Sequence, residues 1–267
     1  MSNTSEPVPA EVRRERILAM VLEHEFVRVS DLSTMFGISD VTVRADLGAL
    51  EERNALRRVR GGAMAVGRRP REEPSFEEAL SASAIEKTLI GAAAAAMISD
   101  GESVMLDVGT TTTFIARALV ARDDLRDVVV FTNGLNIALE LEVAIPRITV
   151  VLTGGTLRPL QHSLVDPMAQ HVFERVNTCT VFLGCNGVHP VAGITNINLP
   201  EAEMKKRMLR ATARRVVVAD GSKIGQIQLA AVAPISGVDL LITGPSADAR
   251  TLDLLRDQGL RVEVVGS

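Results

Sequence analysis

Residues 11–53 place apolar side chains at helical spacing within a strongly charged background. The spacing predicts a first amphipathic helix over 12–24, whose apolar positions are Val12, Ile17, Leu18, Val21 and Leu22. A short extended piece is expected at 27–29. Ser30 provides an N-cap for a second helix over 31–36, and Gly37 ends that helix because glycine adopts the left-handed conformation freely.

A third helix is predicted over 40–53, with Ser39 as its N-cap. Its inward positions are expected to be Val41, Val43, Leu47 and Leu50. A helix, a tight glycine turn and a second helix opened by serine form the layout of a helix-turn-helix. The N-terminal side chains of the second helix would reach base edges, where arginine can bridge O6 and N7 of guanine. We assign DNA contacts to Ser30, Ser39, Asp40, Thr42 and Arg44.

Residues 56–63 alternate and end in a Gly-Gly pair, which predicts a hairpin, the wing of a winged helix-turn-helix. Arg57, Arg58 and Arg60 would contact phosphates or enter the minor groove. Nine arginines and five acidic residues lie between residues 28 and 71, a net charge of +4 on a chain that totals −4. A solvated charged face is the alternative. The coincidence of charge and helix-turn-helix spacing favours a DNA-reading domain over 11–66.

The pattern changes after residue 66. Prolines, a charge run and small residues over 67–84 predict a linker. From residue 85 onward, continuous Val/Ile/Leu strands alternate with helices, which is typical of a mostly parallel sheet covered on both faces. The predicted strands are 103–107, 128–131, 148–152, 180–183, 215–219, 238–243 and 261–265, and the predicted helices are 85–97, 111–120, 133–141, 200–212 and 248–258. The expected fold is a small winged helix-turn-helix followed by a larger α/β domain over 85–267.

Most of these strands end in loops rich in Gly, Thr, Asn and Asp, at 107–113, 132–134, 153–155, 184–187 and 220–223. In an open α/β sheet the ligand lies beyond the carboxyl ends of the strands, so five such loops favour one site over independent turns. In the first loop, Gly109 precedes four threonines and opens a helix, which suits a phosphate or another anion. An ordinary threonine N-cap is the alternative. The spacing matches neither a Walker loop nor a Rossmann glycine motif.

Composition limits the ligand and the chemistry. Tyr and Trp are absent and aromatic residues make up 3% of the chain, so a polar, anionic ligand fits better than one held on aromatic rings. Cys179 and Cys185 form neither a disulfide framework nor a zinc site, and Cys185 is either a small buried residue or a reactive thiol. His162, His171 and His189 lack metal-ligand spacing, and no metal or cofactor is expected. Without a signal pattern or 18 consecutive apolar residues, we expect a cytoplasmic protein with no membrane partner.

The N-terminal part contains the segments Val29-Ser30-Asp31-Leu32, Phe36-Gly37-Ile38-Ser39, Thr42-Val43-Arg44-Ala45-Asp46-Leu47, Leu50-Glu51 and Arg58-Val59-Arg60-Gly61-Gly62-Ala63. Together they resemble the signature of the DeoR family of bacterial transcription regulators. Two positions depart from that signature. Ala45 stands where the family usually has a second arginine, which would alter base preference or remove a phosphate contact. Asn54 stands where it usually has glycine, and asparagine tolerates positive φ.

The C-terminal part contains the segments Leu106-Asp107-Val108-Gly109-Thr110-Thr111-Thr112, Thr132-Asn133, Leu152-Thr153-Gly154-Gly155, Gly193-Ile194-Thr195, Glu201-Ala202-Glu203-Met204-Lys205 and Asp220-Gly221-Ser222-Lys223-Ile224-Gly225. They resemble the sensor domain of the same family, and the resemblance covers roughly residues 11–245. It implies a fold similar to ribose-5-phosphate isomerase and CoA transferases. It also implies a phosphorylated sugar as effector, operator DNA as partner and a homo-oligomer, a dimer or tetramer.

The resemblance implies a role for each matching residue. Asp107, Gly109, Thr110, Thr111 and Thr112 would form a phosphate loop; Thr132, Asn133, Gly154 and Gly155 would line the sugar; and Asn186, Glu201, Lys205 and Lys223 would close the pocket. Asn186 stands where the family often has aspartate. From its chemistry alone, Lys223 is either a phosphate partner or a surface lysine after a strand. Glu201 and Lys205 are four residues apart and could instead form only a helical ion pair.

Two functions follow from these patterns. The first is a ligand-responsive transcription regulator, a repressor of carbohydrate genes that is released by a phosphorylated sugar. The second is a sugar-phosphate isomerase or transferase with an accessory DNA-binding module, in which Asp107, Glu201 and Lys223 would carry acid/base chemistry. The DNA reader makes the enzyme redundant, and no catalytic residue is assigned.

Overall fold

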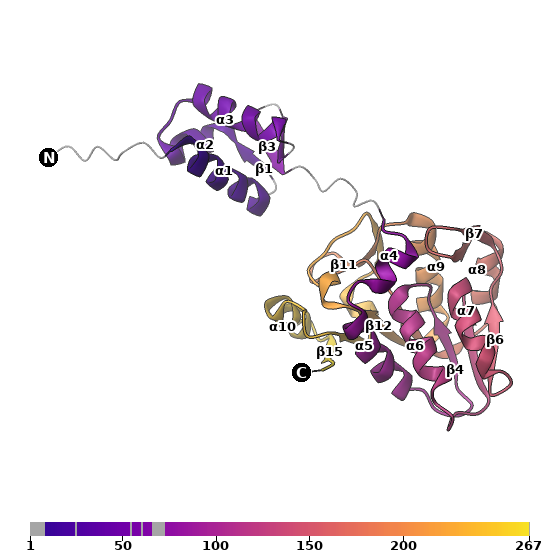
Figure 1. Ribbon diagram of the computed structural model, residues 1–267. Helices are drawn as coiled ribbons and strands as arrows, with labels where there is room; N and C mark the ends of the chain where they lie inside the picture. The colour runs from indigo at the N-terminus through magenta and orange to yellow at the C-terminus, as the bar shows by residue number, and fades with distance from the viewer. Residues whose placement is uncertain (1–8, 25, 54, 60, 66–72, 267) are drawn as a thin grey trace. The chain divides into compact units, whose positions relative to one another are not determined.

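A computed structural model describes residues 9–24, 26–53, 55–59, 61–65 and 73–266. The chain divides into two compact units, Met1–Glu72 and Glu73–Ser267, which are described separately below (Figure 1).

The described residues of the smaller unit form three helices and a three-stranded antiparallel sheet. The elements are α1 (Ala10–His24), β1 (Phe26–Arg28), α2 (Val29–Phe36), α3 (Asp40–Glu52), β2 (Leu56–Val59) and β3 (Gly62–Ala65), and the strand order is β1-β3-β2. Gly37 ends α2 with φ of 62°, and its N–H bonds to the carbonyl of Ser33. Ser39 caps α3 by accepting a hydrogen bond from the N–H of Thr42 at 3.2 Å. The predicted winged helix-turn-helix is therefore confirmed.

Two local predictions in this unit are wrong. Helix α2 begins at Val29, and Ser30 lies inside its first turn instead of capping it. Val41 is 71% exposed, whereas Val43, Leu47 and Leu50 are buried in the hydrophobic core of this unit. The fourth inward position of α3 is taken by Asp46, whose carboxylate accepts hydrogen bonds from Nε of Arg13 at 2.6 Å and Nε of Arg14 at 2.9 Å. A buried carboxylate is stable there because both α1 arginines compensate its charge.

The larger unit is built on a seven-stranded sheet of order β15-β14-β12-β9-β4-β5-β6. Every neighbouring pair in this sheet is parallel. The strands are β4 (Ser103–Leu106), β5 (Val128–Thr132), β6 (Ile148–Leu152), β9 (Thr178–Leu183), β12 (Thr212–Ala219), β14 (Leu240–Thr243) and β15 (Arg261–Val264). These seven are the strands predicted from the apolar runs, and the predicted α/β class is confirmed.

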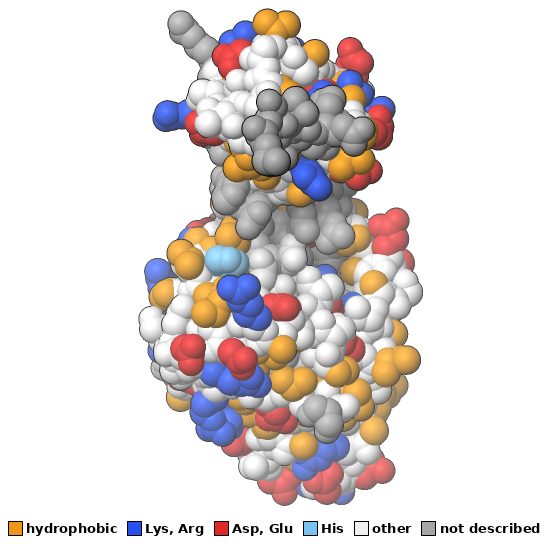
Figure 2. Space-filling view, turned by 90° about the vertical axis from the view of Figure 1, so that its left-hand side faces the viewer, with side chains coloured by type: hydrophobic (Ala, Val, Ile, Leu, Met, Phe, Trp, Pro, Cys, Tyr) orange, Lys and Arg blue, Asp and Glu red, His pale blue; other side chains and the backbone are white. Residues whose placement is uncertain are grey.

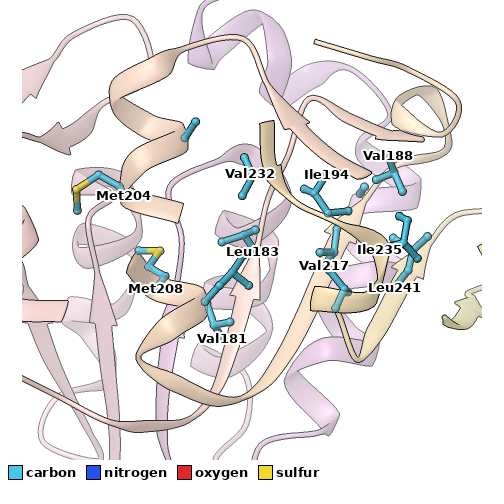
Figure 3. Packing of buried hydrophobic residues seen from close by; sticks show 14 of the residues in the cluster. Val181, Leu183, Val188, Ile194, Met204, Met208, Val217, Val232, Ile235 and Leu241 are labelled. Atoms are coloured by element: carbon cyan, nitrogen blue, oxygen red, sulfur yellow. The ribbon is translucent and has the colours of Figure 1, made fainter. Parts of the chain in front are cut away.

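Helices cover both faces, because successive residues of a buried strand point to opposite sides. One face packs under α5 (Ala84–Ala96), α6 (Thr110–Val120) and α7 (Leu135–Leu141), with Phe182 and Val216 in the shared core. The other packs under α8 (Met168–Phe173), α9 (Leu199–Arg210) and α10 (Ala249–Asp257). Figure 3 shows the second core, with Met204 and Met208 of α9 beside Val181 and Leu183 of β9, and Val217 and Leu241 beside Val188, Ile194 and Ile235.

Short elements that the pattern did not predict join these layers. They are the hairpin β7 (Thr156–Arg158) and β8 (Ser163–Val165), and the small antiparallel sheet of β10 (Gly187–His189), β11 (Gly193–Asn196) and β13 (Ala230–Ala233). Three- and four-residue strands carry too little alternation to be read from sequence.

The expected linker over 67–84 is wrong in its second half, where α4 (Phe76–Ser81) forms within the larger unit. Ser75 and Glu78 make a reciprocal capping box. Phe76 is buried, stacks on His162 with ring centroids 5.4 Å apart, and donates its N–H to the carbonyl of Leu160 at 2.9 Å. One anchored aromatic residue therefore fixes a segment whose composition is typical of a linker.

Candidate functional site

A cavity of about 180 Å³ lies at the carboxyl ends of β4, β9 and β12, three neighbouring strands in the middle of the sheet. The chain runs from β4 to β5 on one side and comes back through β9 to the other, so the strand order reverses between β4 and β9. Ligands of open α/β sheets bind at such a point. Of the thirteen residues predicted for the effector, seven line this cavity: Gly109, Thr110, Thr111, Asn186, Glu201, Lys205 and Lys223.

The loop after β4 presents donors to the cavity. Gly109 is the N-cap of α6 and has φ of 149°, a conformation that favours glycine. The first-turn N–H groups of α6 have no intrahelical acceptor, and they add to the positive end of the helix dipole. Thr110 and Thr111 line the cavity, whereas Thr112 and Thr113 donate their hydroxyls to the carbonyl of Gly109 at 2.9 and 2.8 Å. Two threonines thus hold the loop and two face the cavity.

Thr132 and Asn133 lie behind this loop and are fully buried. Oδ1 of Asn133 accepts the N–H of Val108 at 3.0 Å, and Oγ1 of Thr132 accepts the N–H of Gly134 at 3.0 Å. Neither residue lines the cavity. Asn133 holds the loop after β4, and Thr132 holds the turn after β5. The predicted sugar contacts Gly154 and Gly155 are also outside the lining, because they form the turn into the β7–β8 hairpin.

Asp107 and Lys205 form a buried ion pair beneath the cavity, in which Nζ of Lys205 donates to Oδ2 of Asp107. The same oxygen accepts the N–H of Gly184 at 3.0 Å, and Oδ1 has no hydrogen-bond partner within the described ranges. Burial raises the pKa of Asp107 to about 6, against the opposing charge of Lys205. Burial opposes the charge of Lys205, but Asp107 and Glu201 outweigh it and raise the pKa of the ammonium. The fully buried carboxylate is therefore a structural anchor and not an acid or base facing a substrate.

Glu201 does not pair with Lys205 as the four-residue spacing allowed. Its Oε1 accepts hydrogen bonds from NH1 of Arg158 at 2.8 Å and from Oγ of Ser163 at 2.6 Å. Arg158 also holds Glu73 with both terminal nitrogens. Burial raises the pKa of Glu73, against the opposing effect of Arg158. This Glu73–Arg158–Glu201 bridge ties the start of the larger unit to α9 at the cavity wall.

The remaining predicted wall residues are Asn186 and Lys223. Oδ1 of Asn186 accepts the N–H of Ile197 at 3.1 Å, which holds the wall together. Nζ of Lys223 donates to Oγ of Ser222 at 3.0 Å and lies 3.8 Å from Oδ2 of Asp220, with the lysine side chain one-third exposed. Lys223 was predicted to be either a phosphate partner or a surface lysine, and its position in the cavity lining favours a ligand contact. Cys185 also lines the cavity, and burial raises its pKa to about 12, which makes it an unreactive thiol.

One wall of the cavity was not predicted from the sequence. Glu78, Ala79, Ala82 and Ser83 of the α4–α5 region line it, together with Lys87 from the first turn of α5. A lysine in an Ala-rich helix looks like an ordinary surface residue. Ser75 and Ser83 stand at the N-cap positions of α4 and α5, so two helix starts lie within the expected linker.

In the smaller unit, the first turn of α3 forms an exposed polar surface. Ser39, Asp40 and Arg44 are exposed and Thr42 is half-buried, with NH2 of Arg44 lying 3.4 Å from Oδ2 of Asp40. Val41, which was predicted to face inward, is exposed among them. Its methyl groups suit the C5-methyl group of thymine.

The predicted DNA contacts outside α3 are less completely described. Ser30 is exposed on α2, and Arg58 is exposed on β2. The side chain of Arg57 and all of Arg60 lie outside the described residues. On the face of the larger unit shown in Figure 2, basic side chains are mixed with acidic ones, which is unlike the uniform basic surface that binds nucleic acid. The smaller unit mixes both charges in the same view, so its assignment as the DNA reader rests on the helix-turn-helix and the exposed first turn of α3.

Comparison with known families covers most of the chain. Residues 13–69 match the DeoR-like helix-turn-helix domain, and residues 82–245 match the DeoR C terminal sensor domain. The sensor match includes the cavity-lining loops after β4, β9 and β12.

Several relatives match this chain over most of its length. The HTH-type transcriptional regulator GlpR of Haloferax volcanii is 34% identical, with 96% of this chain and 97% of that protein covered. The HTH-type transcriptional regulator YulB of Bacillus subtilis is 31% identical over 95% of this chain and 96% of its own. The transcriptional repressor AccR of Agrobacterium fabrum is 30% identical over 86% and 88%.

Solved structures are more distant. The full-length sorbitol operon regulator SorC of Klebsiella pneumoniae has a TM-score of 0.42 at 11% identity, with 94% of this chain and 100% of that chain covered. Ribose 5-phosphate isomerase A of Neisseria gonorrhoeae has a TM-score of 0.38 at 17% identity, with 51% and 52% covered. No helix in the described part of the chain combines the length and apolar character needed to cross a bilayer.

Proposed function

This chain belongs to the DeoR family of DNA-binding transcription regulators, and from that premise we propose that it represses carbohydrate genes until a phosphorylated sugar binds the cavity above β4, β9 and β12. It is a regulator and not an enzyme. The observation that carries the proposal is the open first turn of α6 at a strand-order reversal, with Thr110, Thr111 and Lys223 on the same cavity.

The chemistry of the cavity suits a phosphate. The N–H groups at the start of α6 and the hydroxyls of Thr110 and Thr111 are hydrogen-bond donors, and Lys223 adds a positive charge. Asn186 and the carboxylate of Glu201 can accept hydrogen bonds from sugar hydroxyls. A phosphorylated sugar offers the matching groups, an anion at one end and hydroxyls along its length.

In the smaller unit, α3 would read the major groove with Val41 and Arg44, while Ser39 and Thr42 contact bases or phosphates near its start. Arg58 would lie at the DNA backbone as part of the wing. A protein of this kind places two readers on half-sites at fixed spacing, so we propose a homo-oligomer, a dimer or tetramer. Effector binding would release DNA by favouring a conformation with a different spacing of the readers.

Isothermal calorimetry of the full-length chain against pentose and hexose phosphates, with the matching free sugars, tests the effector assignment. We expect one phosphorylated sugar to bind and its free form to bind at least tenfold more weakly. Lys223→Ala should weaken that binding by about tenfold, because a charge-assisted hydrogen bond is worth roughly 1.5–3 kcal/mol and Lys223 is partly exposed. Lys206→Ala is the matched control, since Lys206 lies on α9, outside the cavity lining. Equal affinity for free and phosphorylated sugars would exclude a phosphate site.

A further inference from the structure

Lys87 is buried at the cavity wall and holds the end of α4. It is 3% exposed, and its Nζ donates to the carbonyls of Ala79 at 2.5 Å and Ala82 at 2.7 Å. Ala79, Ala82 and Ser83 themselves line the cavity. The ammonium therefore stands between the interior of the cavity and the segment that closes it.

Among the described residues, Lys87 lacks the ion-pair partner that the other cavity cations have, and the charge of Asp220 acts on it only from beyond ion-pair distance. Lys205 pairs with Asp107, and Lys223 lies 3.8 Å from Asp220. Arg158 pairs with Glu73 and Glu201. Within the described ranges, Lys87 has only carbonyl acceptors and no carboxylate at ion-pair distance. Burial lowers its pKa, so an anion in the cavity would stabilise its charged form.

The cavity is smaller than most small-molecule sites. Its volume is about 180 Å³, whereas ligand sites usually measure roughly 300–1,000 Å³. The floor is the parallel sheet and its loops, which the buried network of Asp107, Lys205 and Asn133 holds in place. The wall formed by 78–83 is one short helix and a turn. Enlargement is therefore expected on the α4 side.

We propose that Lys87 binds the anionic group of the effector and couples its arrival to α4. An anion in the cavity takes the ammonium from the carbonyls of Ala79 and Ala82, and the end of α4 is released. Because α4 is the first helix after the DNA-reading unit in chain order, this movement transmits occupancy toward the reader. The inference rests on the proposed function, since it requires an anionic effector in this cavity.

Hydrogen–deuterium exchange of the full-length chain, with and without the phosphorylated sugar found by calorimetry, is the test. In the wild type we expect the amides of 79–83 to exchange faster when the sugar phosphate is bound. Lys87→Met should weaken sugar-phosphate binding 10- to 100-fold and should make exchange at 79–83 fast without ligand. Lys206→Met, which removes a half-buried lysine on α9 outside the cavity lining, should change neither result.

Different failures have different meanings. If no phosphorylated sugar binds the wild type, the proposed function fails and this inference fails with it. If a phosphorylated sugar binds, but Lys87→Met binds it like the wild type, only the inference is overturned. Slower or unchanged exchange at 79–83 on binding to the wild type also overturns it, and this measurement needs no variant to fold. Unliganded DNA binding by Lys87→Met confirms that its reader is intact.

Discussion

Replacing Lys205 by Met removes one half of the buried ion pair beneath the cavity and leaves Asp107 with the N–H of Gly184. Breaking a buried pair in this way costs about 3–5 kcal/mol when the remaining charge persists. Asp107 can avoid that state by taking up a proton. Its pKa is already about 6 beside the ammonium, so without Lys205 we expect the pKa to rise further and the carboxyl to stay protonated up to neutral pH.

The cost of Lys205→Met should therefore depend on pH. A carboxyl whose pKa is raised in the folded state loses stability as the pH rises between its unfolded and folded pKa values. Between pH 5.5 and 7.5 the variant should lose about 2.7 kcal/mol through Asp107, at roughly 1.4 kcal/mol per pH unit. The wild type, with a pKa of about 6, should lose about 1 kcal/mol over the same range. The destabilisation by Lys205→Met should thus grow by about 2 kcal/mol.

The assay is urea unfolding followed by circular dichroism, because the chain has neither Trp nor Tyr to report by fluorescence. The two units can unfold in separate transitions. Asp46→Asn should shift only the transition of the smaller unit and so identifies the other one. The double variant Asp107→Asn/Lys205→Met should be more stable than Lys205→Met at pH 7.5. Equal destabilisation at both pH values, or a double variant less stable than either single one, would refute the ion-pair account.

Three further predictions concern the reader and the thiols. Arg44→Ala should weaken operator binding by about 1–3 kcal/mol and relax preference at one base pair. Arg58→Ala should weaken binding to all sequences and reduce the salt dependence of binding. Fluorescence anisotropy on operator variants distinguishes the two outcomes. Asp46→Ala should destabilise the smaller unit by about 3 kcal/mol in urea unfolding, because Arg13 and Arg14 lose their buried carboxylate, and a loss below 0.5 kcal/mol would contradict this. At pH 8, iodoacetamide should alkylate exposed Cys179 well before Cys185, as read by peptide mass spectrometry, and equal rates would disprove the raised pKa of Cys185.

The long elements were readable from sequence because their signals repeat. The seven strands of the main sheet are apolar runs, and the cap at Ser39 and the turn at Gly37 are local features. Val41 was wrongly placed inward. The inward face of α3 is Val43, Asp46, Leu47 and Leu50 at regular helical spacing, and Asp46 was not counted as a member because it is charged; two arginines from α1 pair with it there. No property of α3 alone encodes that partnership.

The site was readable only in part, for the same reason. Thr110 and Thr111 belong to a local loop signal, and the structure brings them to the cavity. The role of Arg158 depends on contacts with residues of other elements. The role of Lys87 depends on where α4 ends. Glu201 illustrates the limit, since its spacing from Lys205 suggested a helical pair, whereas its partners are Arg158 and Ser163. Spacing along one helix does not reveal a partner that tertiary folding supplies.

The most direct test of the account is binding of the full-length protein to DNA from its own upstream region, titrated with phosphorylated sugars and the matching free sugars at fixed salt. We expect specific binding that one phosphorylated sugar releases and its free form does not. Specific binding that no phosphorylated sugar changes, or release by the free sugar at the same concentration, would contradict it.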